Sequence, residues 1–476
     1  MAPGPVGDAC ERASEGLHQF PVLAGGETVD GLNKYMVYFV HRHLEYRLAE
    51  VEALATEEAD VRLAWSRPHG DLSESPFWYL HLPSDAHVTA LAERCLLAKA
   101  FLEVWGEGES WEEMCEAVAS YPAERKAPYA AEDQSFCFVV DMWGGTLSIP
   151  DRVRLINKLE GPTKFKGPID LERPMHKFWV IIVEDPGLTN GLPKVPRRFY
   201  FGRQVAVTDR SIIKQYELPA RRYLGPTSME AEMAFLMCNQ ARVGRGSLVF
   251  DPFVGTGSIL VAAAHRGART LGTDIDMRVL KLGKKDRKGA CINTRTNFED
   301  YGLLEPVGLL RADLHKLPFR RGLEEILDAI VCDPPYGVRA GGRKTAARDY
   351  TPRNRETHIA ATDPYSLGEC LRDLLDCAAC LLRTGCRLVY FLPAIADVYD
   401  PAEIPTHPML RLIANCEQVL STRYSRRLIT MEKVRPYNAA EAAAFHEAAG
   451  PPRMAVDDLH AHVYAARPGP DGAAAP

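Results

Sequence analysis

The sequence predicts an α/β protein with a doubly wound, mostly parallel sheet in its carboxyl-terminal half, preceded by an α+β region. Two observations predict the sheet. Short apolar runs typical of buried strands alternate with helical segments between residues 247 and 332. A glycine-rich turn follows the first run, and an acidic residue follows each later one. Open parallel sheets bind ligands at this carboxyl edge, so the same residues predict a binding site.

The first run, residues 247–251, leads into a turn that contains Gly255 and Gly257. Glycine permits a tight turn and lets the backbone approach a ligand closely. Position 260 is Leu, where a dinucleotide-binding fingerprint has its third glycine, and no P-loop sequence occurs in the chain. The turn therefore argues against NAD and against a P-loop nucleotidase.

The next two runs end in carboxylates. Residues 269–273 are followed by Asp274 and Asp276, and a third short run is closed by Asp313. A carboxylate can accept both hydroxyl protons of a ribose. Asp274 therefore suits a ribose diol.

The fourth run, residues 327–332, is followed by Asp333-Pro334-Pro335-Tyr336. Two prolines end a strand and stiffen the turn behind it. Asp333 offers acceptor oxygens, the prolines leave carbonyls without N–H groups, and Tyr336 offers a flat face for stacking. This corner suits a planar ring that carries an exocyclic amine.

The order of these motifs resembles the class I S-adenosylmethionine (SAM)-dependent methyltransferases, and the DPPY corner resembles those that methylate amino nitrogens. The resemblance implies a SAM cofactor and no metal. It implies that the corner is catalytic through Asp333, Pro334, Pro335 and Tyr336. The cofactor-binding residues that it implies are Asp251, Phe253, Gly255, Gly257, Asp274 at the ribose, Ile275, Asp313 at the adenine, and Thr227.

Thr227 and Ser228 have two interpretations. They precede an apolar periodic run over 229–241 and are favoured as the N-cap of that helix. The same helix end would present free N–H groups to the carboxylate of a cofactor. The two interpretations are compatible, and Thr227 stays a candidate cofactor contact.

Length and composition allow a globular chain of two or three domains, with 476 residues, 46% hydrophobic. No apolar stretch is long enough to span a bilayer, and we expect a cytoplasmic protein because the cysteines are scattered and no signal peptide is apparent. Cys377 and Cys380 have metal-ligand spacing, but their leucine neighbours favour a buried helix face. The expected divisions are a flexible leader over 1–30, an α+β region over 31–190, the parallel-sheet domain over 191–445, and a partly disordered tail over 446–476.

The formal net charge is −6, yet residues 151–222 hold fifteen Lys or Arg against eight Asp or Glu. A second basic cluster spans residues 281–288, and a third spans 339–355 behind the DPPY corner. Three such clusters, one of them beside the predicted acceptor pocket, favour contacts with nucleic-acid phosphates. The residues predicted to bind the polyanion are Arg197, Arg198, Arg221, Arg222 and Arg339.

Three further segments, over residues 35–50, 200–203 and 223–229, resemble the catalytic subunit of the eukaryotic tRNA (guanine-10-N2)-methyltransferases. The similarity runs from about residue 34 to 437. Membership would imply a THUMP-containing region that grips tRNA and transfer of a methyl group to the N2 amine of guanosine 10. It would also imply a heterodimer with a small zinc-binding activator subunit.

Two other classes of function remain open on the residues alone. An amino methyltransferase with another acceptor, such as adenine in rRNA or DNA or a protein glutamine, would share the DPPY corner. A non-catalytic RNA-binding subunit would keep the fold, but we would expect it to have lost the glycine turn or the corner. Both are present here.

Overall fold

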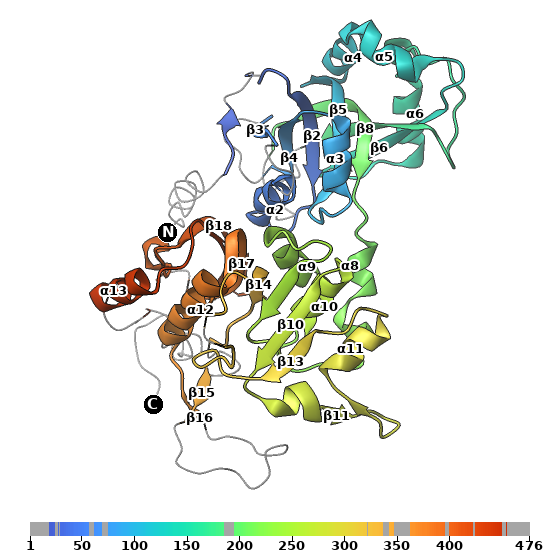
Figure 1. The fold of residues 1–476 in the computed structure, drawn as a ribbon. Coiled ribbons are helices and arrows are strands. Elements are labelled where there is room, and N and C mark those ends of the chain that lie inside the picture. Colours follow the sequence, from blue (N-terminus) through green and yellow to red (C-terminus); the bar gives the residue numbers. More distant parts are fainter. Residues whose placement is uncertain are drawn as a thin grey trace, which may run out of the picture. The chain divides into compact units, whose positions relative to one another are not determined.

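The computed structural model describes residues 19–23, 27, 29–56, 61–68, 75–184, 195–320, 322–336, 342–346, 362–395, 399–421, 424–449 and 454 (Figure 1). They form two compact units, Gln19–Asp209 and a second that begins at Arg210. None of the helices in these residues has the length and apolar character needed to cross a bilayer.

The amino-terminal unit is built on an eight-stranded sheet with strand order β1-β3-β4-β2-β5-β8-β7-β6. The pairs β1–β3 and β6–β7 are parallel and the others are antiparallel. Its strands are β1 (Val22–Leu23), β2 (Asn33–Phe39), β3 (Ala64–Ser66), β4 (Phe77–Leu82), β5 (Ala98–Gly108), β6 (Phe136–Trp143), β7 (His176–Val183) and β8 (Arg198–Val207). Its helices are α2 (Tyr46–Ala55), α3 (Asp85–Ala92), α4 (Trp111–Ser120), α5 (Ala123–Ala130), α6 (Ile149–Asn157) and α7 (Glu160–Thr163).

The strand β8 corrects the predicted domain boundary. It pairs with β5 on one side and β7 on the other, so the first unit extends to Asp209 instead of residue 190. Its Arg203 donates from Nε to Glu103 of β5 at 2.8 Å and from Nη2 to Asp85 of α3 at 2.6 Å. The 200–203 segment is therefore part of the core of this unit. The predicted leader is also too long, because β1 lies within residues 1–30.

The second unit is built on a seven-stranded sheet with strand order β13-β10-β9-β14-β17-β19-β18. The first five strands are parallel, and β19 runs antiparallel to both of its neighbours. This confirms the predicted doubly wound, mostly parallel sheet. The strands are β9 (Leu248–Asp251), β10 (Arg269–Asp274), β13 (Gly308–Arg311), β14 (Leu327–Cys332), β17 (Leu382–Ala394), β18 (Leu410–Val419) and β19 (Ser425–Lys433).

Helices cover both faces of this sheet. Ile330 and Cys332 of β14 pack with α12 in one apolar cluster, and the alternate residues Ala329 and Val331 are equally buried on the other face. A capping box at Ser366 starts α12. The helices are α8 (Ser211–Gln215), α9 (Ala231–Gln240), α10 (Ser258–His265), α11 (Thr294–Asp300), α12 (Leu367–Leu381) and α13 (Ala439–Ala449).

Two small hairpins complete the unit, β11–β12 (Lys284–Lys285 and Cys291–Ile292) and β15–β16 (Arg343–Thr345 and Thr362–Pro364). On the buried side of α12, Cys377 is 9% exposed, as the sequence predicted for this helix face, and Cys380 is partly exposed. The helix α13 continues past the predicted domain end at residue 445.

The strand order reverses between β9 and β14. From β9 the chain proceeds outward through β10 to β13, and it then returns to place β14 on the other side of β9. Open α/β sheets hold ligands in the crevice outside the carboxyl ends of the strands at such a reversal. Asp251 ends β9 and Asp333 directly follows β14, so the two carboxylates lie at this point.

Candidate active site

A cavity of about 820 Å³ lies in the second unit and contains nearly all of the predicted site. Its lining includes every predicted catalytic and cofactor-binding residue except Gly257. Arg343 of the third basic cluster also lines the cavity, and further lining residues come from segments that carried no sequence motif, namely Gln418, Leu420, Ser421, Tyr424, Arg426 and Tyr365.

The glycine turn between β9 and α10 forms one wall. Gly255 has a φ of +49°, and a Cβ placed on it would meet nothing nearer than 3.9 Å, so this glycine leaves open space on the cavity side. Gly257 has a φ of +82°, and a Cβ there would lie 2.8 Å from the Thr294 methyl group. Gly257 is therefore required for packing against α11 under the turn, which explains why it does not line the cavity.

Asp274 ends β10 and ties the glycine turn to the second strand. Its Oδ2 accepts the N–H of Gly255 at 3.0 Å and its Oδ1 accepts the N–H of Asp276 at 2.8 Å. Burial raises the pKa of Asp274, and the backbone hydrogen bonds oppose that shift. Each oxygen keeps a further lone pair, which suits the hydroxyl groups of a ribose.

Asp251 and Asp313 are also held by the backbone. Asp251 is 1% exposed and accepts the N–H of Phe253 at 2.9 Å. Burial raises its pKa well above the ordinary range, and the nearby Asp274 and Asp333 add to the effect. Asp313 accepts the N–H groups of His315 and Thr345. These carboxylates hold the loops at the strand ends in place.

The predicted N-cap at Thr227 and Ser228 is wrong. The helix α9 begins at Ala231, its N-cap is Glu230, and no side chain caps it. Ser228 Oγ instead accepts the N–H of Gly225 at 2.9 Å and lies 2.8 Å from the Thr256 hydroxyl oxygen, so it closes a turn ahead of the helix. Thr227 is exposed and lines the cavity.

The DPPY corner forms the opposite wall. Arg426 Nη1 lies 3.3 Å from Asp333 Oδ2, and the buried Oδ1 of Asp333 has no hydrogen-bond partner among the described residues. Burial raises the pKa of Asp333 to about 6, although the charge of Arg426 and the Tyr336 hydroxyl both act to lower it. A buried acceptor without a donor is unfavourable and marks a position where a ligand can supply the missing hydrogen bond.

Arg426 lies on β19, next to the last strand of the sheet, and it belongs to none of the sequence motifs. The only signal was a pair of arginines, Arg426 and Arg427, just ahead of Leu428 and Ile429. A pattern of that kind does not reveal that one of them faces a carboxylate 93 positions earlier in the chain.

The arginines predicted to contact a polyanion differ in burial and in pairing. Arg221 is 6% exposed and donates to the Ser258 hydroxyl at 2.7 Å, so it holds the start of α10 and is not a surface cation. This prediction is wrong, because a run of basic residues says nothing about burial. Three of the other arginines have acidic partners: Arg222 pairs with Asp300, Arg198 pairs with Glu107, and Arg197 lies 3.6 Å from Glu184. Arg339 is outside the described residues.

The cluster over residues 281–288 differs, because its cations are unpaired. Lys281, Lys285, Arg287 and Lys288 are exposed and form no ion pair with any described residue. The acid between them, Asp286, accepts the N–H groups of Lys288 and Ala290 and closes the turn between β11 and β12. We call these four side chains the basic hairpin.

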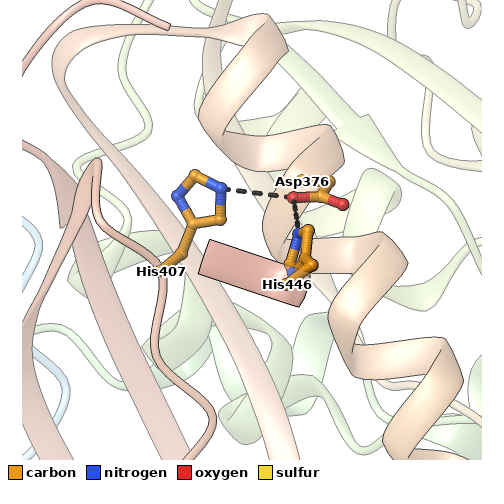
Figure 2. Close-up of side chains that lie close together, drawn as sticks. All are labelled: Asp376, His407 and His446. Carbon is orange, nitrogen blue, oxygen red and sulfur yellow. Dashed lines mark hydrogen bonds and ion pairs between the residues drawn. The ribbon is translucent and has the colours of Figure 1, made fainter. Parts of the chain in front are cut away.

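One group of side chains in the described part of the chain has donors close enough for a metal ion: Asp376, His407 and His446 (Figure 2). His446 Nε2 lies 2.7 Å and His407 Nε2 lies 3.2 Å from the same Asp376 oxygen. The backbone N–H of Met409 donates to His407 Nδ1 at 3.2 Å, so Nδ1 is an acceptor, while His446 Nε2 forms the hydrogen bond to Asp376. The group therefore reads as a hydrogen-bonded anchor for α13, and none of its members lines the cavity.

Comparison with known proteins identifies both units. Residues 33–210 match the family model of the Tmrp11 THUMP N-terminal domain, and residues 219–358 match that of the RMKL-like methyltransferase domain. The mouse tRNA (guanine(10)-N(2))-methyltransferase TRMT11 is 39% identical over 85% of this chain and 89% of its own length. The human TRMT11 is 38% identical over 85% and 89%, and the Dictyostelium discoideum TRMT11 is 33% identical over 85% and 83%. The chain therefore belongs to the TRMT11 family of SAM-dependent tRNA (guanine(10)-N(2))-methyltransferases.

Proposed function

We propose that this chain transfers the methyl group of SAM to the N2 amine of guanosine 10 in tRNA. The observation that carries the proposal is the buried, unpaired Oδ1 of Asp333, in a cavity shared with the glycine turn. The relatives that cover most of the chain bear the name of this activity. The intact turn and corner disfavour a non-catalytic scaffold.

The cofactor side of the cavity suits SAM. Gly255 leaves room beside the turn, Asp274 can accept ribose hydroxyl protons, and Ile275, Phe253 and Asp313 line the same space. Thr227, Asp251 and Gly257 complete the proposed set, Gly257 by shaping the turn. When bound, SAM supplies an electrophilic methyl group on a sulfonium cation. Carboxylates around the cavity favour that positive charge.

The acceptor side suits an aromatic amine. The lone pair of such an amine is delocalised into its ring, so the enzyme must favour the pyramidal nitrogen. Asp333 and the Pro334 carbonyl can accept the two amine hydrogens and orient the lone pair, while Pro335 and Tyr336 shape the corner. A carboxyl group with a pKa of about 6 is ionised at neutral pH and can also receive a proton.

The basic hairpin is our proposed tRNA contact in the methyltransferase unit. Its four cations are unpaired and exposed, so they can neutralise phosphates without breaking an ion pair first. Arg222 and, in the first unit, Arg197 and Arg198 can contribute only by exchanging their present partners. Arg339 is kept as a proposal from the sequence alone.

The small zinc-binding activator subunit is a further part of the proposal, and it rests on the family resemblance alone. The same holds for the heterodimer. A cytoplasmic location is supported by the cysteines, since all eleven in the described residues are free thiols.

Nucleoside analysis by mass spectrometry tests the activity. The protein, with and without the activator, is incubated with SAM and two tRNAs that differ only at position 10, guanosine or inosine. Inosine lacks the N2 amine and otherwise keeps the shape of guanosine. We expect N2-methylguanosine from the first tRNA and no product from the second. A methyladenosine, a methylated protein, or equal labelling of both tRNAs would contradict the proposal.

A further inference from the structure

Arg426 reaches the DPPY corner from across the sheet. β14, which ends before Asp333, pairs with β17, and β17 pairs with β19, where Arg426 lies opposite Pro393. The guanidinium crosses the end of β17, so that Nη1 lies 3.3 Å from Asp333 Oδ2.

The guanidinium is itself held on two further sides. Its Nε donates to Gln418 Oε1 of β18 at 2.7 Å, and its plane lies 3.7 Å from the centre of the Phe391 ring. The side chain of Arg426 is 13% exposed. A planar, always charged group fixed in this way restrains both the position and the charge of its partner.

The two oxygens of Asp333 are therefore not equivalent. Oδ2 faces the guanidinium, while Oδ1 is buried without a partner. Four other titratable groups lie near this carboxylate: the Asp251 carboxylate, the Cys332 thiol, and the phenols of Tyr336 and Tyr424. Arg426 is the cation that opposes the effect of burial on the pKa of Asp333, and the Tyr336 hydroxyl acts in the same direction.

We propose that Arg426 is a positioning residue, which keeps Asp333 ionised through Oδ2 and thereby reserves Oδ1 for a hydrogen of the acceptor amine. The proposal rests on the proposed function only for the identity of that amine. An uncharged side chain at position 426 would leave only the Tyr336 hydroxyl to oppose the effect of burial. The pKa of Asp333 would then rise, and the neutral acid would direct an O–H group at the amine instead of an acceptor.

The test compares Arg426→Gln with Arg427→Gln, its neighbour on β19. Arg427 is also nearly buried and donates to Asn415, but it does not line the cavity. The pH dependence of kcat and of kcat/KM for tRNA is measured for both variants and for Arg426→Lys. We expect Arg426→Gln to lower kcat on the order of 10- to 10²-fold. Its acid limb should move to higher pH, because activity requires the ionised carboxyl and the pKa of that carboxyl has risen.

Arg427→Gln should leave the acid limb unchanged even if it lowers the unfolding temperature. Arg426→Lys should keep the acid limb near its wild-type position, since the charge remains, with a lower kcat because an ammonium group lacks the planar fork. An acid limb that stays in place in Arg426→Gln would overturn the proposal. So would an equal shift in Arg427→Gln.

A double-mutant cycle separates positioning from a general structural effect. If Arg426 acts through Asp333, adding Arg426→Gln to Asp333→Asn should lower kcat by less than about twofold. Full additivity of the two losses would contradict the proposal. The cycle can be run on whichever methylated product the wild-type protein makes. A product other than N2-methylguanosine would refute the proposed function, and the cycle would still test the role of Arg426.

Discussion

The two walls of the cavity hold their carboxylates in different ways. Asp274, on the cofactor wall, receives two backbone N–H groups from its own and the neighbouring loop. Asp333, on the acceptor wall, is held by side chains, among them Arg426 from a distant strand, and has an unpaired oxygen. The backbone fixes the first carboxylate wherever the strands are formed, whereas the second depends on a particular side chain. The position of the first carboxylate thus follows from the fold itself. The position of the second depends on which side chain occupies position 426.

The largest expected effect comes from the acceptor wall. Asp333→Asn should lower kcat on the order of 10²- to 10³-fold, because a neutral amide is a weaker acceptor and places an N–H₂ group beside the amine. SAM affinity, measured by calorimetry, should stay within about threefold, since the contacts of Asp274 are untouched. A comparable loss of SAM affinity would remove the distinction between the walls.

The same variant should be more stable than the wild type at neutral pH. Burial raises the pKa of Asp333 to about 6, so the folded state binds this proton more tightly than the unfolded state does. Stability is therefore lost as the pH rises from the ordinary pKa of Asp, about 4, to about 6, and Asn removes that penalty, on the order of 1–3 kcal/mol at neutral pH. Urea unfolding at pH 7.5 and pH 4.5 measures the effect, which should be clearly smaller at the lower pH. An equal difference at both values would contradict the raised pKa.

On the cofactor wall, Asp274→Asn should weaken SAM binding about 10- to 10²-fold with a smaller change in kcat at saturating SAM. The amide can keep only one of the two backbone hydrogen bonds and turns an N–H₂ group toward the other. Asp276→Asn is the matched control, because Asp276 pairs with the exposed Arg278. Its effect on SAM affinity should be small, and a large kcat loss in Asp274→Asn alone would show that both walls act in the chemistry.

A smaller effect is expected from the basic hairpin, outside both walls. Replacing Lys285, Arg287 and Lys288 by Gln should weaken tRNA binding about tenfold and reduce the slope of log affinity against log salt by about 2–3. Arg222→Gln is the control, because that cation is already paired with Asp300. An unchanged salt slope in the triple variant would place the phosphate contacts elsewhere.

The smallest effect is expected far from the cavity, at the anchor of α13. His446→Gln should cost about 1 kcal/mol of stability, since one hydrogen bond to Asp376 is weakened. The kcat should not change, and added zinc should not raise the unfolding temperature of the wild type. A zinc-dependent rise in that temperature would show that the three side chains bind the ion.

The sequence correctly brought the proposed cofactor residues to one cavity, because they follow the carboxyl ends of parallel strands. Asp251, Asp274 and Asp313 each come directly at the end of an apolar run, and parallel strands bring such ends together. The corner at Asp333 was equally visible. Nothing in the sequence placed Arg426 beside it, because that contact requires the pairing of β17 with β19.

Two other predictions failed for physical reasons of the same kind. Arg221 was predicted as a surface cation, and it is buried against Ser258, a residue 37 positions later in the chain. The residues of β8 were assigned to the second domain, because the proline-containing stretch before them resembles a domain boundary. Charge and turn residues are local signals, whereas burial and strand pairing depend on distant segments.

The carboxylates around the cavity bear on turnover as well as on binding. Methyl transfer converts the sulfonium of the cofactor to a neutral thioether, while Asp274 and Asp333 stay in place on opposite walls. The attraction that favours the donor is thereby absent for the spent product, S-adenosylhomocysteine. The cavity is consequently expected to bind SAM more tightly than S-adenosylhomocysteine. Loss of the positive charge in methyl transfer would then favour replacement of the product by a new SAM molecule.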